Sequence, residues 1–168
     1  MTSNNPAPVT ILAETQIVNH HGDLETFDSF TDRSINSVDG YSVTKNKSIE
    51  STYLTDFDGV LDTETGEVIE LTFTSGEKFE CLSGSQVLTN DYEWVDVDNL
   101  EEGNTLRTVI YNSSHRYSQQ TLKQIAAIER TERSLITAVG FVIRVHDNIL
   151  VSVESDSSIM LLPFKPVA

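Results

Sequence analysis

The sequence predicts an all-β fold with a single domain, and three features of its 168 residues support this prediction. Short runs rich in Val, Ile, Leu, Phe and Thr recur along the whole chain. Gly, Asn and Asp residues separate these runs at close intervals, and only one stretch has the spacing of a helix. Many short strands joined by frequent turns are typical of β-sandwiches and of closed β structures.

A lead-in segment precedes the predicted strands. Residues 1–9 contain two prolines and two asparagines without periodicity, so we expect them to be extended or mobile and to lie outside the domain, which spans 10–168. Turns are expected at 19–22, 38–40, 65–66, 75–76 and 147–148, where turn-forming residues cluster. Strands are expected at 10–18, 34–38, 41–45, 48–54, 68–73, 78–81, 87–88, 94–97, 105–111, 136–145, 149–153 and 158–162.

The clearest local pattern lies at residues 70–106. Apolar residues alternate at 71–73, a Ser-Gly turn follows at 75–76, and alternation resumes at 78–80, so the segment predicts a β-hairpin. The chain then continues with an apolar pair at 87–88, a polar turn at 89–91, a strand around Trp94 and the sequence N-L-E-E-G at 99–103.

This layout resembles the second sequence block of the hedgehog/intein (Hint) self-processing domain. The family pattern there is T-x-x-H, then an apolar pair, a turn, an aromatic residue and L-x-x-G-D. Residues 10–18, T-I-L-A-E-T-Q-I-V, are similar to the intein opening C-L-x-x-E-T-x-I-L. The resemblance covers about residues 10–163 and implies a Hint-like horseshoe of many short strands, in which the two ends of the domain meet at one site.

The residues that perform splicing in that family are replaced in this chain. Thr10 stands at the first Cys, the T-x-x-H block falls on residues 82–85 from Leu82 to Ser85, and the closing His-Asn pair falls on Leu162 and Pro163. A hydroxyl is a much weaker nucleophile than a thiol when no base is adjacent. Ser85 cannot protonate a leaving amide near neutral pH as His does, and Pro163 has no carboxamide with which to cyclise. The resemblance therefore implies a processing site without catalytic residues.

Residues 119–132 fit either a helix or a strand. Leu122, Ile125 and Ala126 have helical spacing, and the Ala, Gln, Lys and Glu residues around them favour a helix. Apolar alternation in the same segment is weak. We predict a strand, because the Hint resemblance places one at this position.

A second motif points to different chemistry. Residues 55–63, T-D-F-D-G-V-L-D-T, resemble the first signature of haloacid-dehalogenase-type phosphatases. In that family Asp56 would be the nucleophile and Asp58 the general acid and base, with Mg²⁺ neutralising the phosphate. The motif should follow a buried parallel strand, but residues 50–54 are hardly apolar, and the alternating helices of an α/β sheet are missing downstream. A Mg²⁺-dependent phosphatase is the second alternative. The principal interpretation requires no cofactor or metal.

Charge and cysteine content restrict the partners. The net charge is −15, from 26 acidic and 11 basic residues, so nucleic acid and anionic membranes are not expected as direct partners. The single Cys81 cannot form an internal disulfide, and we expect it to be a half-buried strand residue. No apolar run has the length of a membrane span and no signal peptide is recognisable. We expect a cytoplasmic protein, or part of a particle assembled in the cytoplasm.

Two classes of function remain for a degenerate Hint-like domain. The first is a structural or protein-binding module that contacts other proteins, copies of itself or a large assembly such as a virion. The alternative is a domain that retains some self-cleavage. Inteins lie inside host proteins, whereas this sequence has nine residues before Thr10 and a handful after Pro163, which favours the first class. A fold alone does not determine function.

Overall fold

The computed structural model describes residues 9–27, 37–55, 60–112, 116–143, 148–153 and 159–167. In this part of the chain, thirteen strands form one sheet and all their pairs are antiparallel, which confirms the all-β prediction. None of the described helices is long and apolar enough to span a membrane. The strands are β1 Val9–Leu12, β2 Gln16–Val18, β3 Leu24–Thr26, β4 Ser37–Val43, β5 Ile49–Thr55, β6 Val60–Phe73, β7 Lys78–Leu82, β8 Gln86–Leu88, β9 Trp94–Asp96, β10 Thr105–Asn112, β11 Arg116–Ile143, β12 Ile149–Val153 and β13 Ile159–Lys165.

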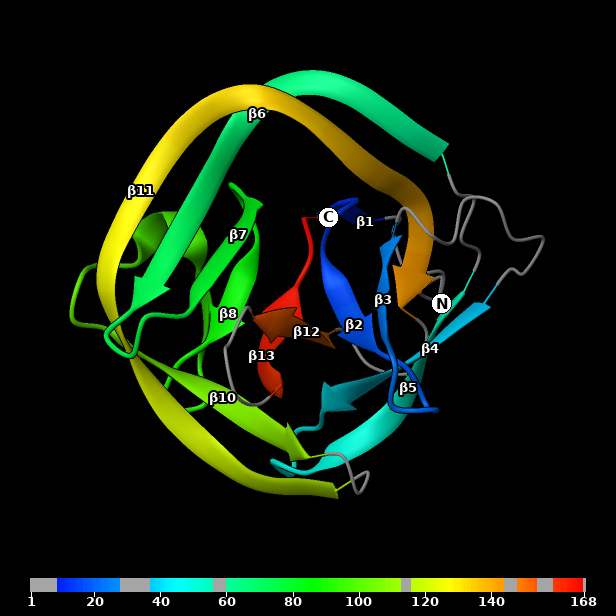
Figure 1. Ribbon diagram of the computed structural model, residues 1–168, viewed down its shortest axis with the longest axis vertical. Coiled ribbons are helices and arrows are strands. Elements are labelled where there is room, and N and C mark those ends of the chain that lie inside the picture. Colours follow the sequence, from blue (N-terminus) through cyan, green and yellow to red (C-terminus); the bar gives the residue numbers. More distant parts are fainter. Residues whose placement is uncertain are drawn as a thin grey trace, which may run out of the picture.

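Two long strands give the molecule its curved shape. β11 pairs with β10 at residues 116–124 and with β6 at residues 125–139. The register between β6 and β11 shifts between Ile125 and Ala127, and such a bulge bends a strand and increases its twist. Figure 1 shows β6 and β11 curving around the outside, with β2, β12 and β13 inside the curve. The horseshoe expected from the Hint resemblance is therefore confirmed.

The main core fills the inside of this curve. In β7, alternation buries Phe79 and Cys81 and leaves Glu80 between them partly exposed, as a strand with one buried face requires. The Phe79 ring packs edge-to-face on Phe164 of β13, with ring centroids 5.4 Å apart. Cys81 is buried among apolar residues, and burial raises the pKa of its thiol. The thiol stays protonated near neutral pH and acts as a small apolar core residue.

The predicted strand at 119–132 is confirmed. These residues belong to β11; residues 119–124 pair with β10, and residues 125–132 pair with β6. One partner strand follows the other along the segment, and this tertiary pairing outweighs its helical propensity.

Several predicted boundaries were wrong, because long-range pairing overrides local turn signals. The strand predicted at 10–18 is two strands, separated by a turn in which Thr15 N donates to Leu12 O at 3.0 Å. The turn predicted at 38–40 lies within β4, paired with β5. The turn predicted at 65–66 lies within β6, where Gly66 leaves room for Leu135.

Two further expectations differ at the start of the chain. Val9 was assigned to the lead-in but belongs to β1 and pairs with Phe141, whereas residues 1–8 lie outside the described residues. The short strand β3 was not predicted; residues L-E-T carry too little alternation to mark it. It forms because β2 provides a partner.

Candidate functional site

Three segments that are far apart in the sequence meet at one place. Thr10 N donates to Val167 O at 2.7 Å, and Val167 N donates to Thr10 O at 3.2 Å. Gly84 lies against the same residue, since a Cβ built on Gly84 would be 3.6 Å from Val167 Cγ1. Figure 1 likewise places the C-terminal end beside β1. We call Thr10, the block loop at residues 82–85 and Val167 the junction site.

A buried apolar cluster packs against the junction site. Leu12, Val68, Leu82 and Leu135 are buried together, and Val167 packs on them while remaining partly exposed. Because these side chains come from β1, β6, β7, β11 and the C-terminal segment, their packing brings the three junction segments together. Leu82, at the end of β7, therefore has a packing role.

The block loop is a tight turn at the end of β7. Gly84 has φ +91°, a conformation that favours glycine, and Ser85 N donates to Leu82 O at 3.2 Å. Ser85 O accepts a hydrogen bond from Val97 N at 2.8 Å, which ties the loop to the segment after β9. The Ser85 side chain is 1% exposed, and its Oγ has no hydrogen-bond partner among the described residues.

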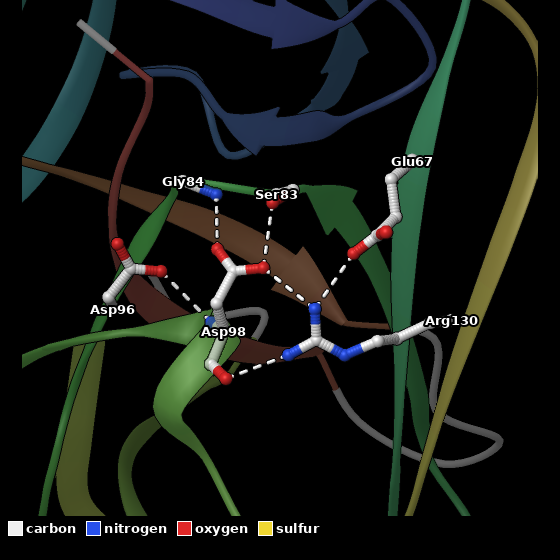
Figure 2. A network of polar contacts seen from close by, with 6 residues as sticks. All are labelled: Glu67, Ser83, Gly84, Asp96, Asp98 and Arg130. Atoms are coloured by element: carbon white, nitrogen blue, oxygen red, sulfur yellow. Dashed lines mark hydrogen bonds and ion pairs between the residues drawn. The ribbon is translucent and has the colours of Figure 1, made fainter.

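Asp98 holds the block loop from the other side. Its Oδ1 accepts from Ser83 Oγ at 2.7 Å, and its Oδ2 accepts from Gly84 N at 2.8 Å. Asp96 Oδ1 in turn accepts from Asp98 N at 2.9 Å and caps the short 3₁₀ turn Val97–Asn99. Figure 2 shows the Asp98 carboxylate between Ser83 and Gly84 on one side and Arg130 on the other.

Arg130 of β11 completes this network. Its Nη1 lies 2.9 Å from Asp98 Oδ1 and 2.8 Å from Glu67 Oε1, and its Nη2 donates to Asp98 O at 2.7 Å (Figure 2). Burial raises the pKa of Asp98, but hydrogen bonds from Ser83, Gly84 and Arg130 outweigh it and lower the pKa to about 2. The carboxylate is therefore ionised near neutral pH, and both its oxygens have donors.

Replacing Ser85 by Ala tests whether its hydroxyl has any role. An unpaired buried hydroxyl loses its hydration without gaining a bond, so Ser85→Ala is expected to keep the free energy of unfolding equal or raise it by up to about 1 kcal/mol. Urea denaturation of the two proteins measures the difference. A loss of stability beyond about 1 kcal/mol would mean that the hydroxyl has a bonding partner.

The remaining candidate site residues do not lie at the junction site among the described residues. Leu162 and Pro163 are buried within β13, opposite Val151 and Leu150, and the residue opposite Thr10 is Val167, four positions after Pro163. Asp56 and Asp58 lie outside the described residues.

Val167, Asp98 and Arg130 were not found from the sequence. Val167 carries no chemical signal, and Arg130 lies 32 residues from Asp98, so only the fold brings them together. The cap at Asp96 does have a local signature, because an Asp before a short turn commonly accepts a backbone N–H two residues later.

Comparisons with known proteins identify the fold. No family model and no curated protein sequence matches the chain. Solved structures do match: the DnaB intein from Synechocystis sp. PCC 6803 gives a TM-score of 0.63 at 14% identity, covering 94% of this chain and 99% of that chain. The fold is intein-like. The TvoVMA intein gives 0.66 at 13% identity, covering 92% and 96%, and the DnaX mini-intein from Spirulina platensis gives 0.57 at 11% identity, covering 92% and 98%.

The intein-like fold does not provide the strand arrangement that the phosphatase interpretation requires. The D-x-D motif of those enzymes follows a buried parallel strand, whereas β5, which precedes residues 56–59 here, is antiparallel to both β4 and β11. Among the residues that the structure describes, no group of three or more His, Cys, Asp or Glu side chains could hold a metal ion.

Proposed function

We propose that this chain is a non-processing intein-like module that serves as a structural or protein-binding component of a larger assembly, such as a virion. One observation carries the proposal. The junction site has the arrangement in which the segments of such a domain meet, yet its side chains at positions 10, 85 and 167 are a hydroxyl, a hydroxyl and an isopropyl group.

The groups around the junction site do not supply the missing chemistry. A hydroxyl at Thr10 needs a neighbouring base to attack a carbonyl. Asp98, the carboxylate that contacts the block loop, has a pKa of about 2 and accepts bonds on both oxygens, so it is a poor base. Cys81 lies just before the block loop, but burial raises the pKa of its thiol and keeps it protonated.

What the chain keeps is a rigid scaffold. The block loop is fixed by Asp98, and Asp98 is fixed by Arg130, which also pairs with Glu67. The block loop is held in place by hydrogen bonds and carries no reactive group, which suits a module whose role is to bind other proteins through its surface. Its net charge of −15 disfavours nucleic acid and anionic membranes as partners, which leaves other proteins, and a cytoplasmic location fits this proposal.

The absence of self-cleavage tests the proposed function directly. We expect the purified chain to keep its intact mass during long incubation with a thiol or with hydroxylamine, because no acyl shift at Thr10 makes an ester for them to cleave. Intact-mass spectrometry over time measures this. Release of residues 1–9 would instead support residual self-processing, the second candidate, which the retained hydroxyl of Thr10 at the junction site favours.

A further inference from the structure

Four hairpins in the described part of the chain contain the same five-residue turn. Residues 19–23, 44–48, 73–77 and 89–93 form these turns. In each turn the first N–H donates to the fifth C=O and the fourth N–H donates to the first C=O, with N to O distances between 2.8 and 3.0 Å. The fourth residue of each turn has the left-handed backbone conformation.

Glycine occupies the fourth position in two of these turns and not in the other two. Gly22 has φ +85° and Gly76 has φ +100°, whereas Lys47 has φ +68° and Tyr92 has φ +60°. This conformation is unfavourable for a residue with a Cβ, and no other non-glycine residue of the described chain has a positive φ. A lysine and a tyrosine therefore weaken these two turns unless their side chains gain a stabilising contact.

The side chains of Lys47 and Tyr92 contact each other. Lys47 Nζ lies 4.6 Å from the centroid of the Tyr92 ring, although the two residues belong to different hairpins. The Arg107 guanidinium carbon lies 4.2 Å from the same centroid, and Arg107 also donates from Nε and Nη2 to Asn90 O at 3.1 and 2.8 Å. A cation near an aromatic ring is attracted to its electron-rich face. The contact therefore connects the tip of the β4–β5 hairpin to the turn between β8 and β9.

The β4–β5 hairpin covers an apolar cluster that is separate from the main core. Val43 of β4 is buried in this separate cluster, and Tyr41 and Ile49 of the hairpin pack against it. The other buried members are Val18, Leu88, Val109, Leu150 and Leu161. At the end of β4, Asn148 Oδ1 accepts from Val43 N and Asn148 Nδ2 donates to Val43 O, both at 2.9 Å. Movement of the hairpin away from the protein would expose the separate cluster.

The opposite face of the hairpin buries two hydroxyl groups against the main core. Gly40 lies opposite Thr52, and a Cβ built on Gly40 would lie 3.5 Å from Cδ1 of the core residue Ile149. Ser42 and Thr52 lie on this same face, because side chains of a strand alternate between its faces. Both residues are 0% exposed, and their hydroxyl oxygens have no hydrogen-bond partner among the described residues. These groups would gain hydrogen bonds with water if the hairpin separated from the core.

We propose that the β4–β5 hairpin, residues 37–55, is a flap that opens while the rest of the protein stays folded, and that the contact between Lys47 and Tyr92 is the latch that holds it closed. Closure buries the separate cluster, whereas opening exposes it and hydrates Ser42 and Thr52. The latch explains why a lysine and a tyrosine occupy positions where two equivalent turns have glycine. The inference is independent of the proposed function, because it concerns a movement within the domain and no processing step.

Native-state hydrogen exchange of the full chain, followed by NMR, tests the flap. Amides of β4 and β5 should exchange faster than amides of β12 and β13, which lie in the middle of the sheet order. Lys47→Gln removes the cation and keeps a Cβ at the left-handed position, so it should raise exchange in β4 and β5 about two- to fivefold. Exchange in wild-type β4 and β5 that is as slow as in β12 and β13 would overturn the flap.

A double-mutant cycle separates the latch from other contacts of Lys47. Tyr92→Leu removes the ring, and in this background the effect of Lys47→Gln on exchange in β4 and β5 should be about two- to fivefold smaller than in the wild type. Lys45→Gln, the matched control, removes the same charge from an exposed residue of the same turn and should have an equal effect in both backgrounds. An equal effect of Lys47→Gln in both backgrounds would overturn the latch.

Discussion

Cleavage of the bond between Val9 and Thr10 is expected to appear when two side chains are restored together, by Thr10→Cys and Ser85→His. The backbone of Thr10 is bonded to Val167, and Val167 contacts the block loop that carries Ser85, so the new groups would lie at one site. The thiol at position 10 attacks the Val9 carbonyl, the C–N bond breaks, and an imidazolium at position 85 gives its proton to the departing nitrogen. Hydroxylamine then cleaves the thioester and releases residues 1–9.

The size of the expected effect follows from general acid catalysis. Such a proton donor accelerates the step by about 10²- to 10⁴-fold, so the double variant should cleave at least about 100-fold faster than Thr10→Cys alone. Intact-mass spectrometry during incubation with hydroxylamine measures both rates. Because Ser85 is 1% exposed and an imidazole is larger than a hydroxyl, the melting temperature should fall. Cleavage is therefore measured where the circular dichroism spectrum matches that of the wild type.

A control places the imidazole elsewhere. Thr10→Cys with Ser75→His carries the same two groups, but residue 75 is in the exposed turn between β6 and β7. This variant should cleave no faster than Thr10→Cys alone. If the folded Thr10→Cys/Ser85→His protein also fails to cleave faster, then the fold has lost the alignment of the junction site as well as its reactive groups.

The sequence predicts which segments form the junction site better than it predicts which C-terminal residue lies opposite Thr10. The resemblance implies that the two ends of the domain meet at one site, and in the structure Thr10 pairs with Val167, against which Gly84 of the block loop also lies. The C-terminal segment, I-M-L-L-P-F-K-P-V, is almost entirely apolar, so no polar landmark fixes which residue lies opposite Thr10. The resemblance points to Leu162 and Pro163, and the backbone pairing points to Val167.

The length of β6 could not be predicted from its residues. Its first half contains Asp62, Glu64 and Gly66, which have low strand propensity. These residues form a strand because β11 provides a continuous partner from Ile125 to Val139. Only the fold shows that β11 continues this far, because part of its own sequence favours a helix.

Asp98 should make the stability of the protein depend on pH below pH 4. Its pKa is lowered from the usual 3.8 to about 2, so the carboxylate stabilises the folded state above about pH 4, and this contribution is lost as the pH falls towards 2. In Asp98→Asn, one of the two oxygens becomes an NH₂ group, which cannot accept from Gly84 N or from Arg130. We expect the free energy of unfolding at pH 7 to fall by about 1 to 2 kcal/mol, a value that allows for partial exposure of the carboxylate.

The pH dependence of the unfolding free energy shows whether Asp98→Asn acts by removing the carboxylate charge or by disturbing the packing around residue 98. Urea denaturation of the wild type and of Asp98→Asn between pH 2 and 7 should give two curves that differ most above pH 4 and converge towards pH 2, because the wild-type carboxyl becomes protonated as the pH falls to its pKa. Asp91→Asn, which removes the same charge from an exposed residue, should follow the wild type throughout. A difference between wild type and Asp98→Asn that stays constant from pH 7 to pH 2 would mean that Ser83, Gly84 and Arg130 do not hold Asp98 as an ionised carboxylate, and the block loop would then owe its position to packing alone.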